Sequence, residues 1–303
     1  MNRLLVWGLA MGLIGFGLFW GLTRPETIAI EQLAGLQGDA ARGEQVFYAG
    51  GCASCHAAPE AANDARLILS GGQRFKSPFG TFLAPNISSD PMAGIGAWSV
   101  RDLVNAMRFG TSPDGAHYYP AFPYTSYVNT SLQDITDLHA FLATLPASDI
   151  ASQPHEVGFP FNIRRGLGLW KRLYGDKGWV LQGDLDEQLT RGRYLVESLG
   201  HCSECHTARG PLGGLQRAAW MGGAPNPDGK GRIPNLTPAA LSWSTQDIVY
   251  YLETGFTPDF DSAGGKMTSV VLNTGKLPIE DRRAIAAYLK SIPPITVATS
   301  QPD

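Results

Sequence analysis

All four cysteines of this 303-residue chain lie in two short stretches, Cys52-Ala-Ser-Cys55-His56 and Cys202-Ser-Glu-Cys205-His206. Cys-x-x-Cys-His is the pattern of covalent haem attachment, in which two thiols bond to the haem vinyl groups and the next histidine binds the iron. The sequence therefore predicts two covalently attached haem c groups, with His56 and His206 as iron ligands.

Other uses of paired cysteines explain the pattern less well. A zinc site would draw both pairs together from nearby positions, but the two pairs are far apart in the sequence. A thioredoxin-like redox pair would not need the histidine after each motif. Four cysteines are also too few to form the disulfide scaffold of a chain this long.

Composition sets broad limits on the class of protein. Apolar residues make up 44% of the chain and charged residues 17%, which is typical of a globular protein. The length favours two domains. With 24 basic and 27 acidic side chains, the net charge of −3 argues against a nucleic-acid partner.

The N-terminus carries no charge from Leu4 to Leu22, and a helix of that length spans about 29 Å, close to the bilayer hydrocarbon thickness. No small-x-small cleavage site follows it. We predict that residues 1–23 form an uncleaved single-pass anchor in a bacterial inner membrane, with the haem domains in the periplasm. A cleaved signal peptide and a buried core helix are the alternatives. Residues 24–37 are expected to be a spacer.

The chain contains an internal repeat. Each copy has, in the same order, an Arg-Gly pair, the cysteine motif, a Pro-Asn pair, a Trp-Ser pair, a glycine twelve residues after the tryptophan and an amphipathic stripe. The expected divisions are domain 1 at 38–146, a connector at 147–189, domain 2 at 190–296 and a tail at 297–303.

The repeat predicts helices with defined ends. Ser99 and Ser244 are each followed three residues later by aspartate, which is a helix-start pattern. Gly110 and Gly255 mark the corresponding ends. Apolar stripes predict a last helix in each copy, so the expected fold is all-α.

The pattern resembles class I cytochrome c domains, and more closely the membrane-anchored multi-haem cytochrome subunits of bacterial periplasmic dehydrogenases, such as membrane-bound alcohol dehydrogenase. The segments that carry this resemblance are Pro85-Asn86-Ile87, Tyr119-Pro-Ala-Phe-Pro-Tyr124 and Phe159-Pro-Phe-Asn-Ile-Arg164. It implies an electron-transfer subunit without independent catalysis. Such a subunit relays electrons between a periplasmic dehydrogenase or quinone and a downstream acceptor or oxidase. Several such subunits have three haem motifs, whereas this chain has two.

The sixth iron ligands differ between the repeats. Met267 lies twelve residues after Gly255, in an expected loop before the last helix, and is predicted to ligate the second haem. Phe122 holds the matching position after Gly110 and cannot ligate iron.

For the first haem we expect Met107 as a tentative ligand, because it lies on the helix that lines the distal face in cytochrome c folds. Packing against the porphyrin is its alternative role. An open five-coordinate haem beneath Phe122, ligation by His117 and ligation by Met92 are the other possibilities. An open haem would permit a different function, either a peroxidase or thiosulfate-dehydrogenase type of enzyme or a gas-binding protein.

The connector alternates basic and large apolar residues between Arg164 and Tyr174. Two interpretations remain open. The segment is either a strap whose aromatic residues pack across both domains, or a helix that docks on a membrane surface or a partner protein.

Overall fold

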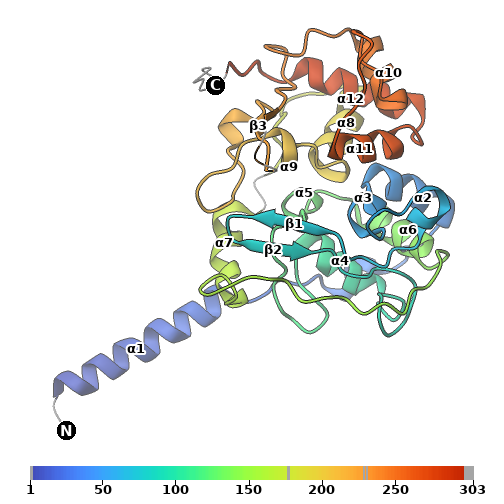
Figure 1. Cartoon of the computed structure of the whole chain (residues 1–303). Helices are drawn as coiled ribbons and strands as arrows, with labels where there is room; N and C mark the ends of the chain where they lie inside the picture. Colours follow the sequence, from blue (N-terminus) through green and yellow to red (C-terminus); the bar gives the residue numbers. More distant parts are fainter. Residues whose placement is uncertain (1–2, 176–177, 228, 230, 297–303) are drawn as a thin grey trace.

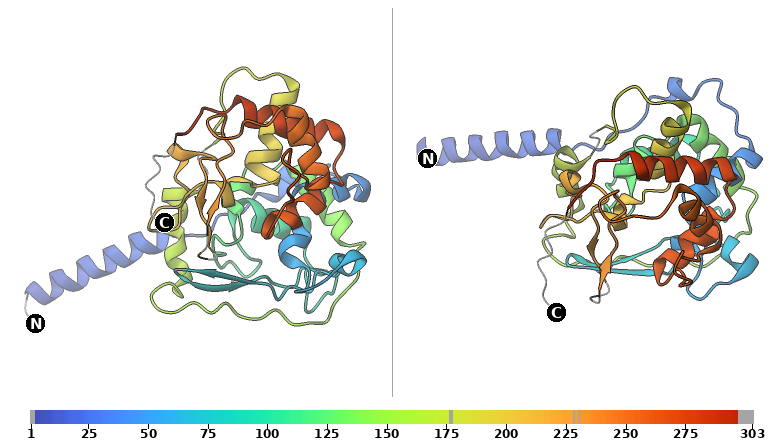
Figure 2. Two further views of the ribbon diagram at one scale, coloured as in Figure 1. Left: turned by 45° about the horizontal axis from the view of Figure 1, so that its top comes forward. Right: turned by 90° about the horizontal axis from the view of Figure 1, so that it is seen from above.

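A single long helix, α1 (Arg3–Leu22), projects from a body of two helical domains (Figure 1). This computed structural model describes residues 3–175, 178–227, 229 and 231–296. None of the α1 residues is buried. Within the described ranges, α1 is the only helix long and apolar enough to cross a membrane. The two views in Figure 2 show that it stands clear of the body along most of its length. The expected tail at 297–303 lies outside the described residues.

Domain 1 is built from short helices and one hairpin. Its helices are α2 (Ala40–Ala49), α3 (Cys52–His56), α4 (Val100–Phe109), α5 (Tyr124–Tyr127) and α6 (Leu132–Leu142). A 3₁₀ turn at Asn63–Leu67 follows the first cysteine motif. Strands β1 (Arg74–Ser77) and β2 (Gly80–Leu83) pair antiparallel, with Arg74 opposite Leu83.

Domain 2 repeats this order. Its helices are α8 (Glu187–Arg193), a π-helical stretch (Tyr194–Leu199), α9 (Ser203–His206), α10 (Thr245–Thr254), α11 (Lys266–Thr274) and α12 (Ile279–Ser291). A 3₁₀ turn at Arg217–Ala219 leads toward β3 (Ala224–Pro225), which pairs antiparallel with β4 (Arg232–Ile233). The helical fold is confirmed, although the sequence analysis did not foresee the two small hairpins.

In each domain the first and last helices cross in direct contact at a glycine. A Cβ on Gly43 of α2 would lie 2.0 Å from the carbonyl oxygen of Asp137 on α6. On Gly192 of α8 it would lie 2.1 Å from the carbonyl oxygen of Ala284 on α12. No side chain fits at either position, because these distances are far below van der Waals contact. The glycine of each Arg-Gly pair is therefore required by the helix crossing.

The arginine beside each glycine ties the same two helices together. Arg42 Nε lies 2.8 Å from Asp137, whose side chain is buried, and Arg191 Nε lies 2.8 Å from Asp281. Burial alone would raise the pKa of Asp137. The Arg42 guanidinium and the other hydrogen bonds to the carboxylate outweigh burial, so this pKa is lowered. The repeated Arg-Gly pair thus encodes both the close approach and a bidentate clamp.

The predicted boundaries of the middle helices are confirmed. α4 and α10 each begin with a complete capping box, formed by Ser99 with Asp102 and by Ser244 with Asp247. α4 ends at Gly110 in the left-handed conformation, with φ at 56°.

The segment expected as a spacer, 24–37, packs on domain 1. Ile28 is buried, its amide donates to Asn105 Oδ1 at 2.8 Å, and its carbonyl accepts from Arg101 Nε at 3.1 Å. A 3₁₀ turn at Ile30–Leu33 continues the segment. The chain between α1 and α2 is therefore held against α4.

The connector wraps domain 1 before it enters domain 2. Glu156 forms a β-bridge with Thr81, and Asn86 Nδ2 donates to the carbonyls of Ser148 and Ile150. A 3₁₀ turn (Arg164–Gly166) then leads into α7 (Leu167–Tyr174). α7 lies beside the C-terminal end of α1 (Figure 1).

Replacing Gly43 by alanine is expected to destabilise the protein by about 1–3 kcal/mol, because the added methyl group overpacks the α2–α6 crossing. Alanine normally stabilises a helix relative to glycine. A loss of stability in Gly43→Ala would therefore indicate that the added methyl group does not fit at the crossing. Chemical denaturation of the holoprotein measures it. Gly158→Ala is the control, because nothing lies within 4 Å of a Cβ at Gly158. Equal stability of the Gly43→Ala protein and the unsubstituted protein would contradict the tight crossing.

Candidate haem sites

Each cysteine motif folds as about one turn of helix. α3 starts after Gly51, which is left-handed with φ at 60°, and α9 follows His201, with φ at 37°. No disulfide joins the four cysteines, all of which lie in the described part of the chain. Because residues three apart share a helix face, the two thiols of each motif can bond to the same ligand.

Both motif histidines are held by the same kind of contact. His56 Nδ1 lies 2.9 Å from the carbonyl oxygen of Pro85, and His206 Nδ1 lies 2.8 Å from that of Pro234. Because a carbonyl can only accept, each Nδ1 carries the proton and each Nε2 keeps a free lone pair. This is the tautomer and orientation that an iron-ligating histidine needs.

The Pro-Asn pairs of the repeat position these carbonyls. Asn235 Nδ2 donates to the Ile295 carbonyl, as Asn86 does to the connector. Burial also lowers the pKa of both His56 and His206, which favours the neutral, metal-binding form of the imidazole. The residues present therefore fit a haem c group at each motif. The cysteines match the vinyl attachment, and each histidine presents Nε2.

Met267 lies at the second position of α11, half-buried against the hydrophobic core. The sequence analysis expected a loop here, and that expectation is wrong. Gly265, with φ at 56°, turns the chain immediately before α11. The Val271 side chain packs against Gly255, so the segment becomes a helix on the end of α10.

The candidates for the first distal position lie in different environments. Met107 is 5% exposed and belongs to the same core cluster as Ala53 of the first motif. Its counterpart Leu252 is equally buried, in domain 2. Met92 is 92% exposed. Phe122 is half-buried, with its ring centroid 5.7 Å from that of Tyr127.

His117 is buried beneath the end of α1. Its Nε2 lies 2.8 Å from the carbonyl oxygen of Thr23, so this nitrogen carries a proton and donates. Its Nδ1 has no hydrogen-bond partner within the described part of the chain. Burial is the main cause that lowers the pKa of His117, and nearby cationic side chains add to it. The imidazole is therefore neutral and is fixed toward the anchor helix.

The two domains exchange contacts at their cysteine motifs. Ser54, inside the first motif, accepts a hydrogen bond from Asn273 Nδ2 of α11 at 2.8 Å. Glu204, inside the second motif, accepts from Ser126 Oγ of α5 at 3.3 Å. α5 follows Phe122 and α11 contains Met267, so each motif is contacted by the distal segment of the other domain.

The segments that lead into the two motifs also meet at this interface. Tyr127 donates to the Gly50 carbonyl at 3.4 Å, and its ring centroid lies 5.5 Å from that of His201. Burial raises the pKa of the Cys55 thiol to about 11; nearby Lys266 lowers this pKa and nearby Cys205 raises it. Sequence reasoning missed this juxtaposition, because Ser54 and Glu204 occupy the unrestricted positions of the motif.

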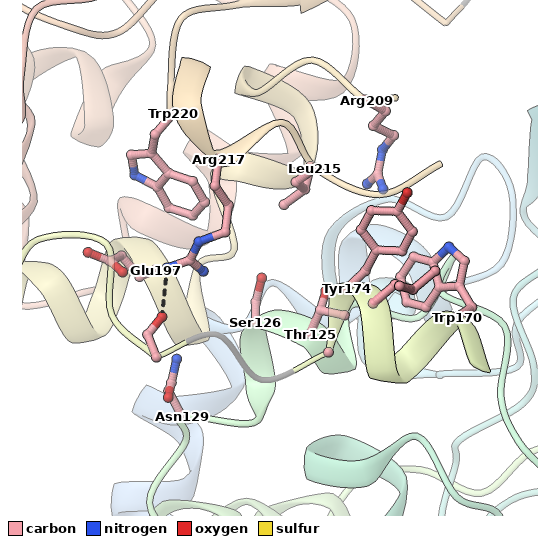
Figure 3. Close-up of a pocket in the computed structure, with 13 residues that line it drawn as sticks. Thr125, Ser126, Asn129, Trp170, Tyr174, Glu197, Arg209, Leu215, Arg217 and Trp220 are labelled. Carbon is pink, nitrogen blue, oxygen red and sulfur yellow. Dashed lines mark hydrogen bonds between the residues drawn. The ribbon is translucent and has the colours of Figure 1, made fainter. Parts of the chain in front are cut away.

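A cavity of about 380 Å³ lies where α5, α7 and domain 2 meet (Figure 3). Arg217 Nη2 donates to the Gly178 carbonyl at its edge, at 2.9 Å. The buried Glu197 carboxylate beside it accepts from the amides of Val180 and Leu181 and from the Tyr288 hydroxyl. These bonds join the connector to α12, so Glu197 has a structural role.

The chain belongs to the cytochrome c family, whose model matches residues 40–146 and 189–293. It is 59% identical over 295 residues to a diheme cytochrome c-type protein of Cereibacter sphaeroides, covering 97% of this chain and 100% of that protein. The comparison supports an electron-transfer cytochrome that uses haem c.

Cytochrome subunits of dehydrogenases are also similar. Identity is 36% over 260 residues to the fructose dehydrogenase cytochrome subunit of Gluconobacter japonicus, covering 83% of this chain and 52% of that subunit. Identity is 34% over 269 residues to the cytochrome c subunit of alcohol dehydrogenase (quinone) of Gluconobacter oxydans, covering 84% of this chain and 55% of that subunit. The chain therefore spans about half the length of these two subunits.

The hydrogen bond between the domains can be measured with a double-mutant cycle of Ser54→Ala and Asn273→Ala. We expect a coupling free energy of about 1 kcal/mol, because the two polar groups form a part-buried hydrogen bond. Thermal denaturation of the holoprotein is the readout. Ser291→Ala, which removes an exposed hydroxyl on α12, is the control and should change stability by less than about 0.5 kcal/mol. Additive single effects would show that the domains do not meet at this bond.

Proposed function

We propose that the chain is a membrane-anchored, periplasm-facing electron relay with two covalently attached haem c groups. The observation that carries this proposal is that each cysteine motif accepts a hydrogen bond from the other domain, at Ser54 and at Glu204. Next to the motifs, the Tyr127 ring of domain 1 packs against the His201 ring of domain 2. A haem at each motif would supply an iron that gains and loses one electron. The protein then holds the two attachment sites at a fixed separation.

The residues of the chain have distinct roles in this relay. His56 and His206 bind the irons from one side and are oriented by proline carbonyls. Met267 is the proposed sixth ligand of the second haem, and a thioether ligand raises the reduction potential.

For the first haem we propose Met107 as the sixth ligand. Its support is that Met107 is buried on α4, the helix that the resemblance to cytochrome c implies lines the distal haem face. His117 is engaged with Thr23, and the Met92 side chain is exposed to solvent.

A second candidate function follows from Phe122, which holds the position of Met267 in the repeat. If Met107 only packs against the porphyrin, the first haem is five-coordinate and open. A gas-binding protein or a haem enzyme of the peroxidase or thiosulfate-dehydrogenase type would use such a site.

The relay also needs a location and partners. α1 has 20 residues and an estimated length of about 30 Å, sufficient for one membrane crossing. Two relatives are named as cytochrome subunits of fructose and alcohol dehydrogenases. We propose that electrons pass between a periplasmic dehydrogenase or quinone and a downstream acceptor or oxidase.

Spectroscopy of ligand variants tests the axial assignments. Met267→Ala is expected to lower the potential of one haem and abolish its sulfur-to-iron absorption band, because a thioether ligand is lost. Met107→Leu should do the same for the other haem. Met92→Leu is the matched control and should leave both bands intact, because this side chain is in solvent.

Carbon monoxide separates the two candidate functions. The relay predicts two low-spin haems in the unsubstituted protein, with no affinity for carbon monoxide at the first haem. A high-spin first haem that binds carbon monoxide and turns over peroxide would contradict it and favour the enzyme.

A further inference from the structure

Side chains of the connector bind the C-terminal end of α1. Thr23 is fully buried, and its hydroxyl accepts from Arg165 Nε at 2.8 Å. Arg165 also donates to the Trp20 carbonyl, and its guanidinium lies 4.1 Å from the centroid of the Trp20 ring. Arg172 Nε donates to the Leu22 carbonyl at 2.7 Å. The last carbonyls of α1, which have no partner within the helix, are thus capped by two guanidinium groups.

Two further contacts fix the end of α1 to the rest of the protein. A Cβ on Gly168 of α7 would lie 2.6 Å from Thr23 Cα, so α7 touches the backbone of the anchor. From domain 1, His117 donates to the Thr23 carbonyl. The anchor is therefore joined to α7 and domain 1 by short contacts at its last turn, without a flexible tether.

The length of α1 places this junction relative to a membrane. If α1 fills a hydrocarbon layer of about 30 Å, then Trp20 and Thr23 lie at the outer interface. Arg165 and Arg172 bond directly to this last turn, so they lie at the depth of the lipid headgroups. α7 must then lie along the bilayer surface or just above it (Figure 1).

The exposed surface of α7 has the chemistry of an interfacial helix. Leu169 and Leu173, one turn apart, are 41% and 60% exposed, with Arg172 beside them. Leu173 also borders the cavity between α7 and domain 2, so only part of its side chain faces outward. The segment that leads into α7 also exposes Phe159 and Ile163. In a chain of net charge −3, four arginines lie at or next to this junction: Arg24, Arg164, Arg165 and Arg172. Lys171 is turned inward, where it donates to the carbonyls of Phe109 and Gly110 and burial lowers its pKa to about 7. Apolar side chains beside arginines are typical of helices that bind anionic bilayer surfaces.

We propose that the outward face of α7, defined by Leu169, Arg172 and Leu173, docks on the outer leaflet of the membrane that α1 crosses. The leucines insert among the lipid chains, and the arginine lies at the lipid phosphates. This proposal rests on the membrane anchor put forward under the proposed function. It adds that the haem domains are held against the bilayer in one orientation. An electron donor or acceptor dissolved in the membrane would then always meet the same face.

Photo-crosslinking in the full holoprotein tests this surface. Leu173 is replaced by the photoreactive residue p-benzoylphenylalanine, and the protein is reconstituted in vesicles of phosphatidylethanolamine and phosphatidylglycerol. Leu272 on α11 is the matched control, because it is a leucine on a short helix with 53% exposure. After irradiation, mass spectrometry is expected to find lipid adducts on the chain labelled at 173 and none on the chain labelled at 272.

Two results would overturn the proposal. One is the absence of lipid adducts at 173 in membrane-bound protein. The other is crosslinking of 173 only to a second copy of the chain, or in native membranes only to another protein.

Alkaline carbonate extraction of the same samples reports on the anchor separately. Extraction of the chain with adducts still present at 173 would remove the transmembrane anchor but support the docking surface. Resistance to extraction without adducts at 173 would keep the anchor and contradict the docking surface.

Discussion

Everything in each domain depends on the crossing of its first and last helices at a glycine. At Gly43 and Gly192 the backbones touch, and no residue with a Cβ fits. The cysteine motif begins three residues after α2 ends, so the crossing fixes where the motif leaves the core. The Arg42–Asp137 and Arg191–Asp281 pairs fix the rotation of the helices against each other. Packing at one residue per domain therefore sets the frame on which each cysteine motif lies.

The second constraint is reciprocal docking between the domains. Each motif receives a hydrogen bond from a short helix of the other domain, at Ser54 from α11 and at Glu204 from α5. A movement of either helix would therefore be transmitted to the cysteine motif of the other domain. These two hydrogen bonds help to hold the two domains together as a pair.

Sequence reasoning succeeded where the determinants are local. The capping boxes and the glycine helix ends each depend on residues a few positions apart. It failed where a segment is shaped by distant partners. In α11, Val271 lies against the end of α10 at Gly255; residues 24–37 are held by Asn105 and Arg101; and the short hairpins carry no alternating apolar pattern. The contact of each motif with the other domain was equally unpredictable, since it depends on how the domains pack.

The central claim is that the two haem sites communicate within one molecule across the domain interface. Pulse radiolysis of the oxidised holoprotein tests it most directly, by placing one electron on a molecule and following its redistribution between the two haem spectra. We expect a redistribution that is faster than about 10³ s⁻¹, the upper range of typical enzyme turnover, and independent of protein concentration. A redistribution rate proportional to protein concentration would mean that electrons pass only between molecules, and would contradict the relay.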